Sequence, residues 1–417
     1  MAQVNTEVVA LQLEKVRDKI PLLYERDDIL LTMIEKRGDV EKVSSRNMRI
    51  PLQINPGGKG GMYNADGGDL GRGSGTRYEV AQVTPIFFRF ATEITKLVEY
   101  ATNSSEKAVE NAAKREVTQA MKQFRTFLDQ VMQSSSDCVI GTISDVSATP
   151  VLTMSVPFGA ALVYVGQTIQ IWNAALTTLR GSAVVTGVDS ISATQTITVD
   201  VDPGAANTDV ITFDTGATSI NPVGLFGVPY HQNNAVTGTW LNLNRATYPT
   251  QLQTPAVNAA SSALTPQYIR LAKNKQRKAL GTNYKPKLIA YTSLEQQAAY
   301  ENLGLAIRTI MNQGGRPQGL ETLFDQEQMN MDGTKVVASI HANQTRIDFL
   351  DLSHWGRAVM KEVDYFKVGS TTVFPIYGAS GGISAAYVFY FDTGFQVFVD
   401  SPRAGAFIYS LTRPSGY

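Results

Sequence analysis

The sequence is poor in the side chains that bind soft metals or carry out redox chemistry. Among 417 residues there are one cysteine and three histidines. The single Cys138 excludes an intramolecular disulfide framework and a thiolate metal cluster. His231, His341 and His354 leave little room for a histidine-rich metal site. We therefore expect neither a metal nor any other cofactor.

Charge is also scarce, at 18% of residues against about 25% in typical soluble domains. Lys and Arg total 37, Asp and Glu total 37, and the formal net charge is zero. A dedicated nucleic-acid binder would normally carry a basic surplus. The balance disfavours that class and permits a large neutral surface that meets other neutral surfaces.

Long apolar runs are missing as well. No uncharged stretch has the composition of a bilayer span, and residues 1–20 lack the apolar segment of a signal peptide. We therefore expect no membrane association and the cytoplasm of the producing cell as the default location. The length predicts about two to three folding units.

The N-terminal third divides by composition into three parts. Residues 1–50 are charged and helical in pattern, and they predict an arm that packs on something else. In residues 51–85, nine of the nineteen positions from Gly57 to Gly75 are glycine, and strand-like flanks surround them. This pattern predicts a long two-stranded hairpin with a flexible tip. Residues 86–137 contain apolar positions at helical spacing, which predict a helix over about 104–132, roughly 43 Å long.

Residues 138–235 are rich in Thr, Val, Ile, Ser and Gly and almost free of charge. Short strands with turn signals between them, such as Leu179-Arg180-Gly181, predict a compact β-sandwich or barrel inserted into a helix-containing unit. The expected strands are Val151–Ser155, Thr168–Trp172, Ala183–Val188, Gln195–Val201 and Val210–Phe213.

Residues 236–417 are mixed. Helices are expected from Thr265 to about Leu280 and from Leu294 to Leu305. The expected strands are Leu288–Tyr291, Lys335–Ser339, Thr345–Asp351, Val373–Pro375, Ile383–Phe391 and Phe395–Phe398.

Known ligand-binding motifs fail in the glycine-rich tip. Gly58-Lys59 lacks the spacing of a phosphate-binding loop, and Gly71-Arg72-Gly73 lacks the third glycine of a dinucleotide motif. Asn64, Asp66 and Asp69 lack the spacing and closing glutamate of a calcium loop. We interpret these glycines as a source of flexibility.

The candidates for catalysis are equally weak. Asp351, Ser353 and His354 are residue types found in triads, but Ser353 lacks a nucleophile elbow. His354-Trp355-Gly356-Arg357 is interpreted as closing a turn, and Cys138 as a small core residue. One local excess of charge comprises Arg270, Lys273, Lys275, Arg277 and Lys278. On a helix, these residues form a solvated face, a subunit contact or a weak contact with packaged nucleic acid.

The order of arm, glycine-tipped hairpin, long helix and mixed remainder resembles a tailed-bacteriophage major capsid protein of the Hong Kong 97 fold, an α+β class. On that resemblance, Arg49–Val83 matches the extended loop (E-loop) and Ser104–Gln133 the spine helix of the peripheral (P) domain. Residues 265–417 match parts of the axial (A) and P domains, and residues 138–235 an inserted domain.

The resemblance implies a structural protein, not an enzyme, that self-assembles into hexamers and pentamers of an icosahedral head enclosing double-stranded DNA. It implies a virion location after assembly in the host cytoplasm. A separate scaffolding protein, a portal and a decoration protein are the further partners it suggests. No crosslinking is expected, because Lys59 has no identifiable acceptor. The expected inter-subunit residues of the tip are Gly57, Gly58, Lys59, Gly60, Gly61, Gly67, Gly68 and Arg72.

Two other classes remain open from the sequence. One is a hydrolase that uses His354 or His231 and a β-rich substrate-binding domain. The other is a different phage structural protein of the tail or decoration type. The long helix disfavours a tail-tube protein, whose subunits are mostly β-sheet.

Overall fold

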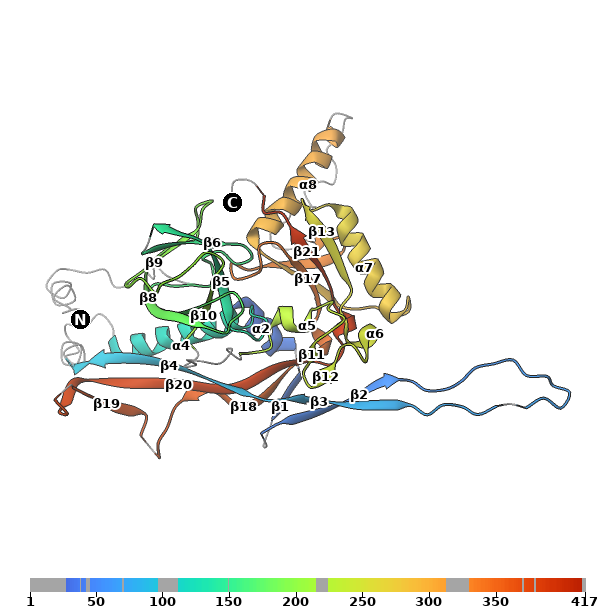
Figure 1. Ribbon diagram of the computed structural model, residues 1–417, viewed down its shortest axis with the longest axis horizontal. Helices are drawn as coiled ribbons and strands as arrows, with labels where there is room; N and C mark the ends of the chain where they lie inside the picture. Colours follow the sequence, from blue (N-terminus) through green and yellow to red (C-terminus); the bar gives the residue numbers. More distant parts are fainter. Residues whose placement is uncertain are drawn as a thin grey trace.

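The computed structural model describes residues 28–37, 39–42, 46–69, 71–96, 112–148, 150–214, 224–312, 330–369, 371–378 and 380–414. A long sheet forms the base, and the helix α4 (Ala112–Val131) packs on it. Above them stand a β-barrel and a mixed α/β unit, and a thin hairpin extends far beyond the body (Figure 1).

The base sheet has the strand order β1-β18-β20-β19, with β4 also paired to β20. Strand β4 (Ile86–Thr95) runs antiparallel to β20, from Ile86 opposite Phe395 to Thr95 opposite Ala386. The sequence patterns did not predict β4. The remaining strands are β1 (Asp39–Lys42), β18 (Trp355–Tyr365), β19 (Val373–Tyr377) and β20 (Ile383–Val399).

Two sequence interpretations of this sheet are wrong. The stretch from His354 to Arg357 does not close a turn, because the 3-10 helix η3 (Leu352–His354) ends there and β18 begins at Trp355. The two strands expected between Ile383 and Phe398 form one continuous strand, β20. Its Gly394 allows the ring of Phe87 to approach, since an added Cβ would lie 2.4 Å from Phe87 Cε1.

The predicted hairpin is confirmed. Strands β2 (Met48–Asn55) and β3 (Arg77–Val83) pair antiparallel, with Met48 opposite Val83 and Asn55 opposite Arg77. Residues 56–76 between them contain no strand or helix among the residues described there. The tip therefore continues the two strands away from the body, as Figure 1 shows.

The second half of the predicted N-terminal arm is part of the core. Helix α2 (Ile29–Arg37) places Leu30, Leu31 and Ile34 in the interior against α4. The first half of the predicted arm, residues 1–27, lies outside the described residues. The same holds for the predicted start of the long helix at residues 104–111, whereas its course from 112 to 131 is confirmed.

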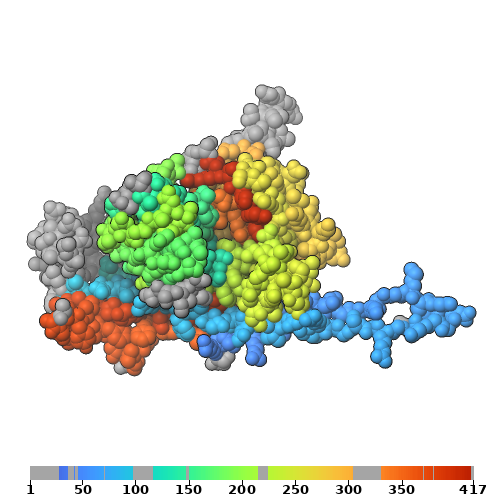
Figure 2. Space-filling model, viewed as in Figure 1, coloured from blue at the N-terminus to red at the C-terminus, as the bar shows by residue number. Residues whose placement is uncertain are grey.

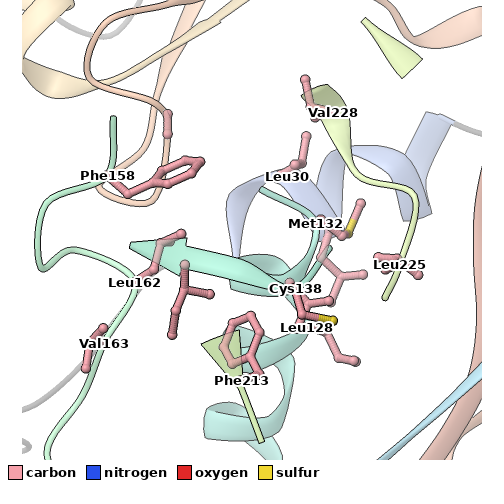
Figure 3. Packing of buried hydrophobic residues seen from close by; sticks show 14 of the residues in the cluster. Leu30, Leu128, Met132, Cys138, Phe158, Leu162, Val163, Phe213, Leu225 and Val228 are labelled. Atoms are coloured by element: carbon pink, nitrogen blue, oxygen red, sulfur yellow. The ribbon is translucent and has the colours of Figure 1, made fainter. Parts of the chain in front are cut away.

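The core is continuous from the helices into the barrel. Figure 3 shows Leu30 and Leu128 of the helices, and Met132 directly after α4, beside Cys138 and Phe213 at the barrel end. The Phe127 and Phe213 rings meet edge to face with centroids 4.9 Å apart. Burial of these shared apolar surfaces fixes the barrel to α4.

The inserted block forms a closed antiparallel barrel with the order β10-β5-β6-β9-β8-β7. The predicted strands are present, but β5 was not predicted and the expected turn at Leu179-Arg180-Gly181 is wrong. Those residues begin β8, and Gly181 lies close to another segment, because an added Cβ would be 3.0 Å from the carbonyl oxygen of Pro203. The division of the chain at residues 138 and 235 stays a prediction. The strands are β5 (Val139–Ala148), β6 (Val151–Ser155), β7 (Thr168–Trp172), β8 (Leu179–Asp189), β9 (Thr196–Val199) and β10 (Val210–Phe213).

The α/β unit contains a six-stranded sheet with the order β13-β21-β17-β14-β16-β15. The predicted helices are present as α7 (Pro266–Leu280) and α8 (Leu294–Asn312), and α8 extends beyond its expected end. The strands are β13 (Ala256–Ser262), β14 (Leu288–Thr292), β15 (Asn330–Met331), β16 (Thr334–Ala338), β17 (Ile347–Asp351) and β21 (Ala406–Leu411). Short elements connect this unit to the base: α5 (Val228–His231), β11 (Thr239–Trp240), β12 (Leu243–Asn244), α6 (Pro249–Leu252) and η4 (Pro402–Ala404).

Candidate assembly surfaces

The hairpin tip has a closed neck. The Gly58 amide donates to the Ser74 carbonyl at 2.8 Å, and the Ser74 hydroxyl donates back to the Gly58 carbonyl at 2.8 Å. Gly57 has φ +71°, and an added Cβ would lie 2.7 Å from the backbone of Gly75 and Thr76. At this position glycine meets a steric requirement of the turn, in addition to its predicted flexibility.

Beyond the neck, the expected tip residues lie in solvent, and none of them contacts the body of the subunit in a described interaction. Two apolar side chains lie there as well, Met62 at 105% and Tyr63 at 60% exposure. The expected residues at exposed positions beyond the neck are Lys59, Gly60, Gly61, Gly67, Gly68 and Arg72.

The polar residues of the tip serve turns. The Asn64 side chain accepts from the Asp66 amide at 3.0 Å, and the Asp69 side chain accepts from the Gly71 amide at 3.0 Å. In the described part of the chain, no three His, Cys, Asp or Glu side chains are grouped as a metal site. The tip oxygens therefore have a local structural use.

The base of the hairpin is anchored on the segment around β11 and β12. Asn242 bridges to β3 in both directions: it accepts from the Gln82 amide at 2.7 Å and donates to the Val80 carbonyl at 2.9 Å. Tyr248 donates a hydrogen bond to Glu79, and this bond, with help from Arg77, lowers the pKa of Glu79. The sequence patterns missed these anchors, because nothing in a polar loop residue signals a partner some 160 positions away.

The basic cluster on α7 divides into two groups. The Lys273 ammonium donates to the Met331 carbonyl at 3.1 Å and pairs with Asp332, and burial lowers its pKa. Lys275 donates to the Ala256 carbonyl at 2.7 Å. Arg270, Arg277 and Lys278 are exposed and have no such intramolecular partner among the described residues. The structure thus leaves three of the five predicted cations for external contacts.

His231 has a structural role. Its Nδ1 accepts from the Trp240 indole at 3.2 Å, so its Nε2 carries the proton and donates to the Val397 carbonyl at 3.2 Å. Burial lowers the pKa of His231 to about 3. Both ring nitrogens are occupied within the core, and neither is placed to accept a proton from a substrate.

Asp351, Ser353 and His354 lie close together but not as a triad. The Ser353 hydroxyl donates to Asp351 at 2.6 Å, and this carboxylate also accepts from the Ser353 amide as the cap of η3. The imidazole of His354 contacts the Tyr284 hydroxyl at 2.8 Å. The serine hydroxyl is thus directed at the carboxylate and not at an imidazole base, unlike an activated nucleophile.

Cys138 is 4% exposed, and burial raises the pKa of its thiol to about 12. Its sulfur lies against Gly224, where an added Cβ would approach to 2.3 Å. This confirms the interpretation of Cys138 as a core residue, because a neutral buried thiol is a poor nucleophile.

A cavity of about 1280 Å³ opens between the base sheet, α4 and the barrel. Nine of its 22 lining residues are aromatic, among them Phe88, Phe127, Phe213 and Tyr390. Its polar lining side chains include Arg89, Asp214 and Asp392.

A buried contact between a carboxylate and an imidazole, which the sequence patterns missed, joins three parts of the molecule. The Asp129 carboxylate on α4 contacts His341 Nδ1 at 2.9 Å and accepts from the Leu31 amide of α2 at 3.0 Å. Both side chains are fully buried. Only the fold brings these residues, which are up to 310 positions apart, into contact.

Comparison with known proteins identifies the fold. No family model and no curated protein matches the sequence. The capsid asymmetric unit of cyanophage A-1(L) is similar in structure with a TM-score of 0.55 and 12% identity, over 96% of this chain and 97% of that one. The chain has the Hong Kong 97 capsid fold.

Other solved structures show lower similarity. Mycobacterium phage Bobi has a TM-score of 0.49 at 8% identity, over 97% of this chain and 98% of that one. The capsid of Myoviridae phage XM1 has a TM-score of 0.48 at 11% identity, over 96% and 97%. The assignments of β2–β3 as the E-loop, of α4 as the spine helix and of the base sheet to the P domain stay predictions. Among the described residues no helix has the length and apolar character needed to cross a membrane.

Proposed function

We propose that this chain is a structural major capsid protein of a tailed phage. In the proposal, copies assemble into hexamers and pentamers of an icosahedral head that encloses double-stranded DNA. The observation that carries it is the E-loop, which extends beyond the body and makes no described contact with it past the neck at Gly58 and Ser74.

Exposed apolar side chains on the hairpin support burial by a second copy. Met62, Tyr63, Tyr78 and Val80 are exposed at 105, 60, 63 and 44%. Each Å² of apolar surface removed from water contributes about 25 cal/mol, which offsets the entropy of fixing the tip. Contacts of this kind, repeated by every copy, are what closed symmetric assemblies require.

Deletion of the tip tests the proposal. Replacement of Gly57–Gly75 by a two-residue turn should abolish shells, because the arm could no longer reach a neighbour. Negative-stain microscopy and sedimentation would measure the loss of shells. The soluble subunit should keep its circular dichroism spectrum, since the anchors at Asn242 and Tyr248 lie outside the deletion.

Point variants separate the apolar contact from tip length. Met62→Ser with Tyr63→Ser should lower the yield of shells, whereas Asp66→Ser, also at an exposed tip position, should leave it unchanged. Normal shells from the variant that lacks Gly57–Gly75 would contradict the proposal.

The other partners of the proposal are a scaffolding protein, a portal, packaged DNA and a decoration protein. Virion location and assembly in the host cytoplasm are also parts of it. We propose no catalytic role, and the internal use of His231 and the direction of the Ser353 hydroxyl support this. Shells purified from the native source should contain DNA that is protected from nuclease. Shells that never contain protected DNA would contradict the enclosure of DNA.

A further inference from the structure

Charges of opposite sign occupy two consecutive blocks of this neutral chain. Residues 126–244 contain eight aspartates and one arginine, with no glutamate and no lysine. Residues 245–294 contain eight Lys or Arg and no acidic residue. The first block includes the barrel, and the second includes α7.

Part of the acidic block is used inside the subunit. Asp129 pairs with His341, and Asp209 pairs with Arg180 at 3.1 Å. Three other aspartates lie at the end of β8 and directly after β9, and no Lys or Arg among the described residues forms an ion pair with them. We call Asp189, Asp200 and Asp202 the acidic edge.

Local hydrogen bonds hold the acidic edge in place. Asp189 accepts from the Ser192 amide at 3.0 Å, Asp200 from the Val184 amide at 2.8 Å, and Asp202 from the Gly204 amide at 2.9 Å. Hydrogen bonds from Ser192 and Ile191 also lower the pKa of Asp189. The edge is therefore a row of carboxylates held in place by backbone amides.

The basic block presents a matching surface. Arg270, Arg277 and Lys278 share one side of α7, at i, i+7 and i+8. Lys285 and Lys287 are exposed in the segment that follows the helix. No acidic side chain in the described part of the chain forms an ion pair with these five cations, which we call the basic face.

The two surfaces lie on opposite flanks of the subunit. Figure 2 shows the barrel at one side of the body and α7 at the other, above the base sheet. In Figure 1, β8 and β9 form the side of the barrel farthest from α7. Complementary patches on opposite flanks cannot meet within one copy, but they can meet between successive copies in a ring.

We propose that the acidic edge of one copy binds the basic face of the next copy in a head-to-tail contact. The inference rests on the proposed function and deepens it by naming two surfaces that meet within a capsomer. A second copy fits better than a nucleic acid, because a polyanion would satisfy the basic face and leave the acidic edge unmatched. Exposed charge pairs are individually weak and screened by salt, so this contact sets orientation and register.

Two charge variants test the contact. The first is Asp189→Asn, Asp200→Asn, Val201→Lys and Asp202→Asn, which changes the formal charge of the acidic edge from −3 to +1. Each asparagine keeps a side-chain acceptor for the Ser192, Val184 or Gly204 amide, and Val201 is 59% exposed. The second is Arg270→Glu, Arg277→Glu and Lys278→Glu, which changes the formal charge of the basic face from +5 to −1. Each variant alone should associate about tenfold more weakly in sedimentation velocity, since both of its flanks then carry the same sign.

An equimolar mixture of the two variants gives the decisive result. In an alternating ring every contact again joins opposite charges, so the mixture should recover the association of the wild type. The control variant Glu116→Lys with Glu362→Lys adds positive charge at exposed positions on α4 and β18 and should associate normally. Circular dichroism checks that each variant folds.

The outcomes separate this contact from the proposed function. Wild-type rings that never close into shells contradict the shell and leave the contact supported. Wild-type association in both single variants, or no recovery in the mixture, overturns the contact. An equal loss of association in the control variant overturns the contact as well. The contact is also overturned if the basic-face variant associates normally and loses only its binding to short duplex DNA at low salt. Subunits that remain monomeric under all conditions contradict both.

Discussion

His231 shows how a buried polar residue becomes a structural part of the core. The indole of Trp240 fixes its tautomer, and the Val397 carbonyl on β20 accepts its remaining proton. A second proton would have no acceptor, which agrees with the depressed pKa of about 3. Folding therefore favours the neutral ring.

The stability of the subunit should depend on pH through His231. Its pKa is depressed from 6.5 to about 3, so below pH 6.5 the unfolded chain binds a proton that the folded chain does not. Stability from this residue is complete above pH 6.5 and should fall by about 1.4 kcal/mol per pH unit below it. Urea unfolding at pH 7, 6 and 5 would measure this slope.

The variant His231→Gln is the control for that slope. It removes the titrating group but keeps a side-chain donor for the Val397 carbonyl. Its free energy of unfolding should start lower and change less between pH 6.5 and 5. An equal slope in both proteins would assign the pH dependence to other groups.

At the scale of elements, the hairpin depends on a small number of anchors. Asn242 bonds both a donor and an acceptor of β3, and the apolar cluster of Ala81, Trp240 and Leu243 lies beside it. These contacts set the direction in which the tip leaves the body.

Removal of the Asn242 side chain should loosen the root of the hairpin. Asn242→Ala loses two hydrogen bonds, worth about 1–3 kcal/mol in total. Faster amide hydrogen exchange in residues 77–83, measured by mass spectrometry, is the expected result. Asn244→Ala is the matched control, because that side chain bonds only the nearby Ala246 amide. Similar exchange in both variants would mean that the apolar cluster alone fixes the hairpin.

Helices and strands bounded by turn residues were predictable from the sequence. Glycines inside long strands were misleading, because they suggested turns or breaks where the strand continues. The hairpin, α7 and the barrel strands follow local apolar periodicity, which their sequences contain. Gly181 and Gly394 resemble turn residues, yet each lies in a strand that another segment approaches closely. The partners, Pro203 and Phe87, are distant in sequence, so the reason for each glycine is visible only in the fold.

At the scale of the whole molecule, Asp129 connects the arm helix, the spine and the α/β unit. Its carboxylate bonds the Leu31 amide and His341, which lies between β16 and β17. The sequence indicated none of this, because an aspartate on an amphipathic helix is normally a surface residue. The candidate assembly residues were easier to propose from the sequence, since glycine content and charge clusters are local properties.

Loss of this carboxylate should destabilise the whole subunit. Asp129→Ala leaves the Leu31 amide and a buried imidazole without their partner, and the expected cost is about 3–5 kcal/mol. Asp129→Asn keeps a carbonyl acceptor for Leu31 and should cost less. Denaturant unfolding of the soluble subunit measures both values, and an alanine variant as stable as wild type would refute the role of the pair.

The pairing of β4 with β20 also has a consequence for the order of folding. Phe90 lies opposite Phe391, so about 300 residues must be synthesised before the strand meets its partner. At 5–20 residues per second this delay is about 15–60 s. The barrel strands are close in sequence and can pair during that time, and Phe88 and Phe90 can pack on α4. The backbone hydrogen-bonding groups of β4 that pair with β20 stay without that partner until it is made. The nascent chain is therefore most prone to aggregation just before its C-terminal strands arrive.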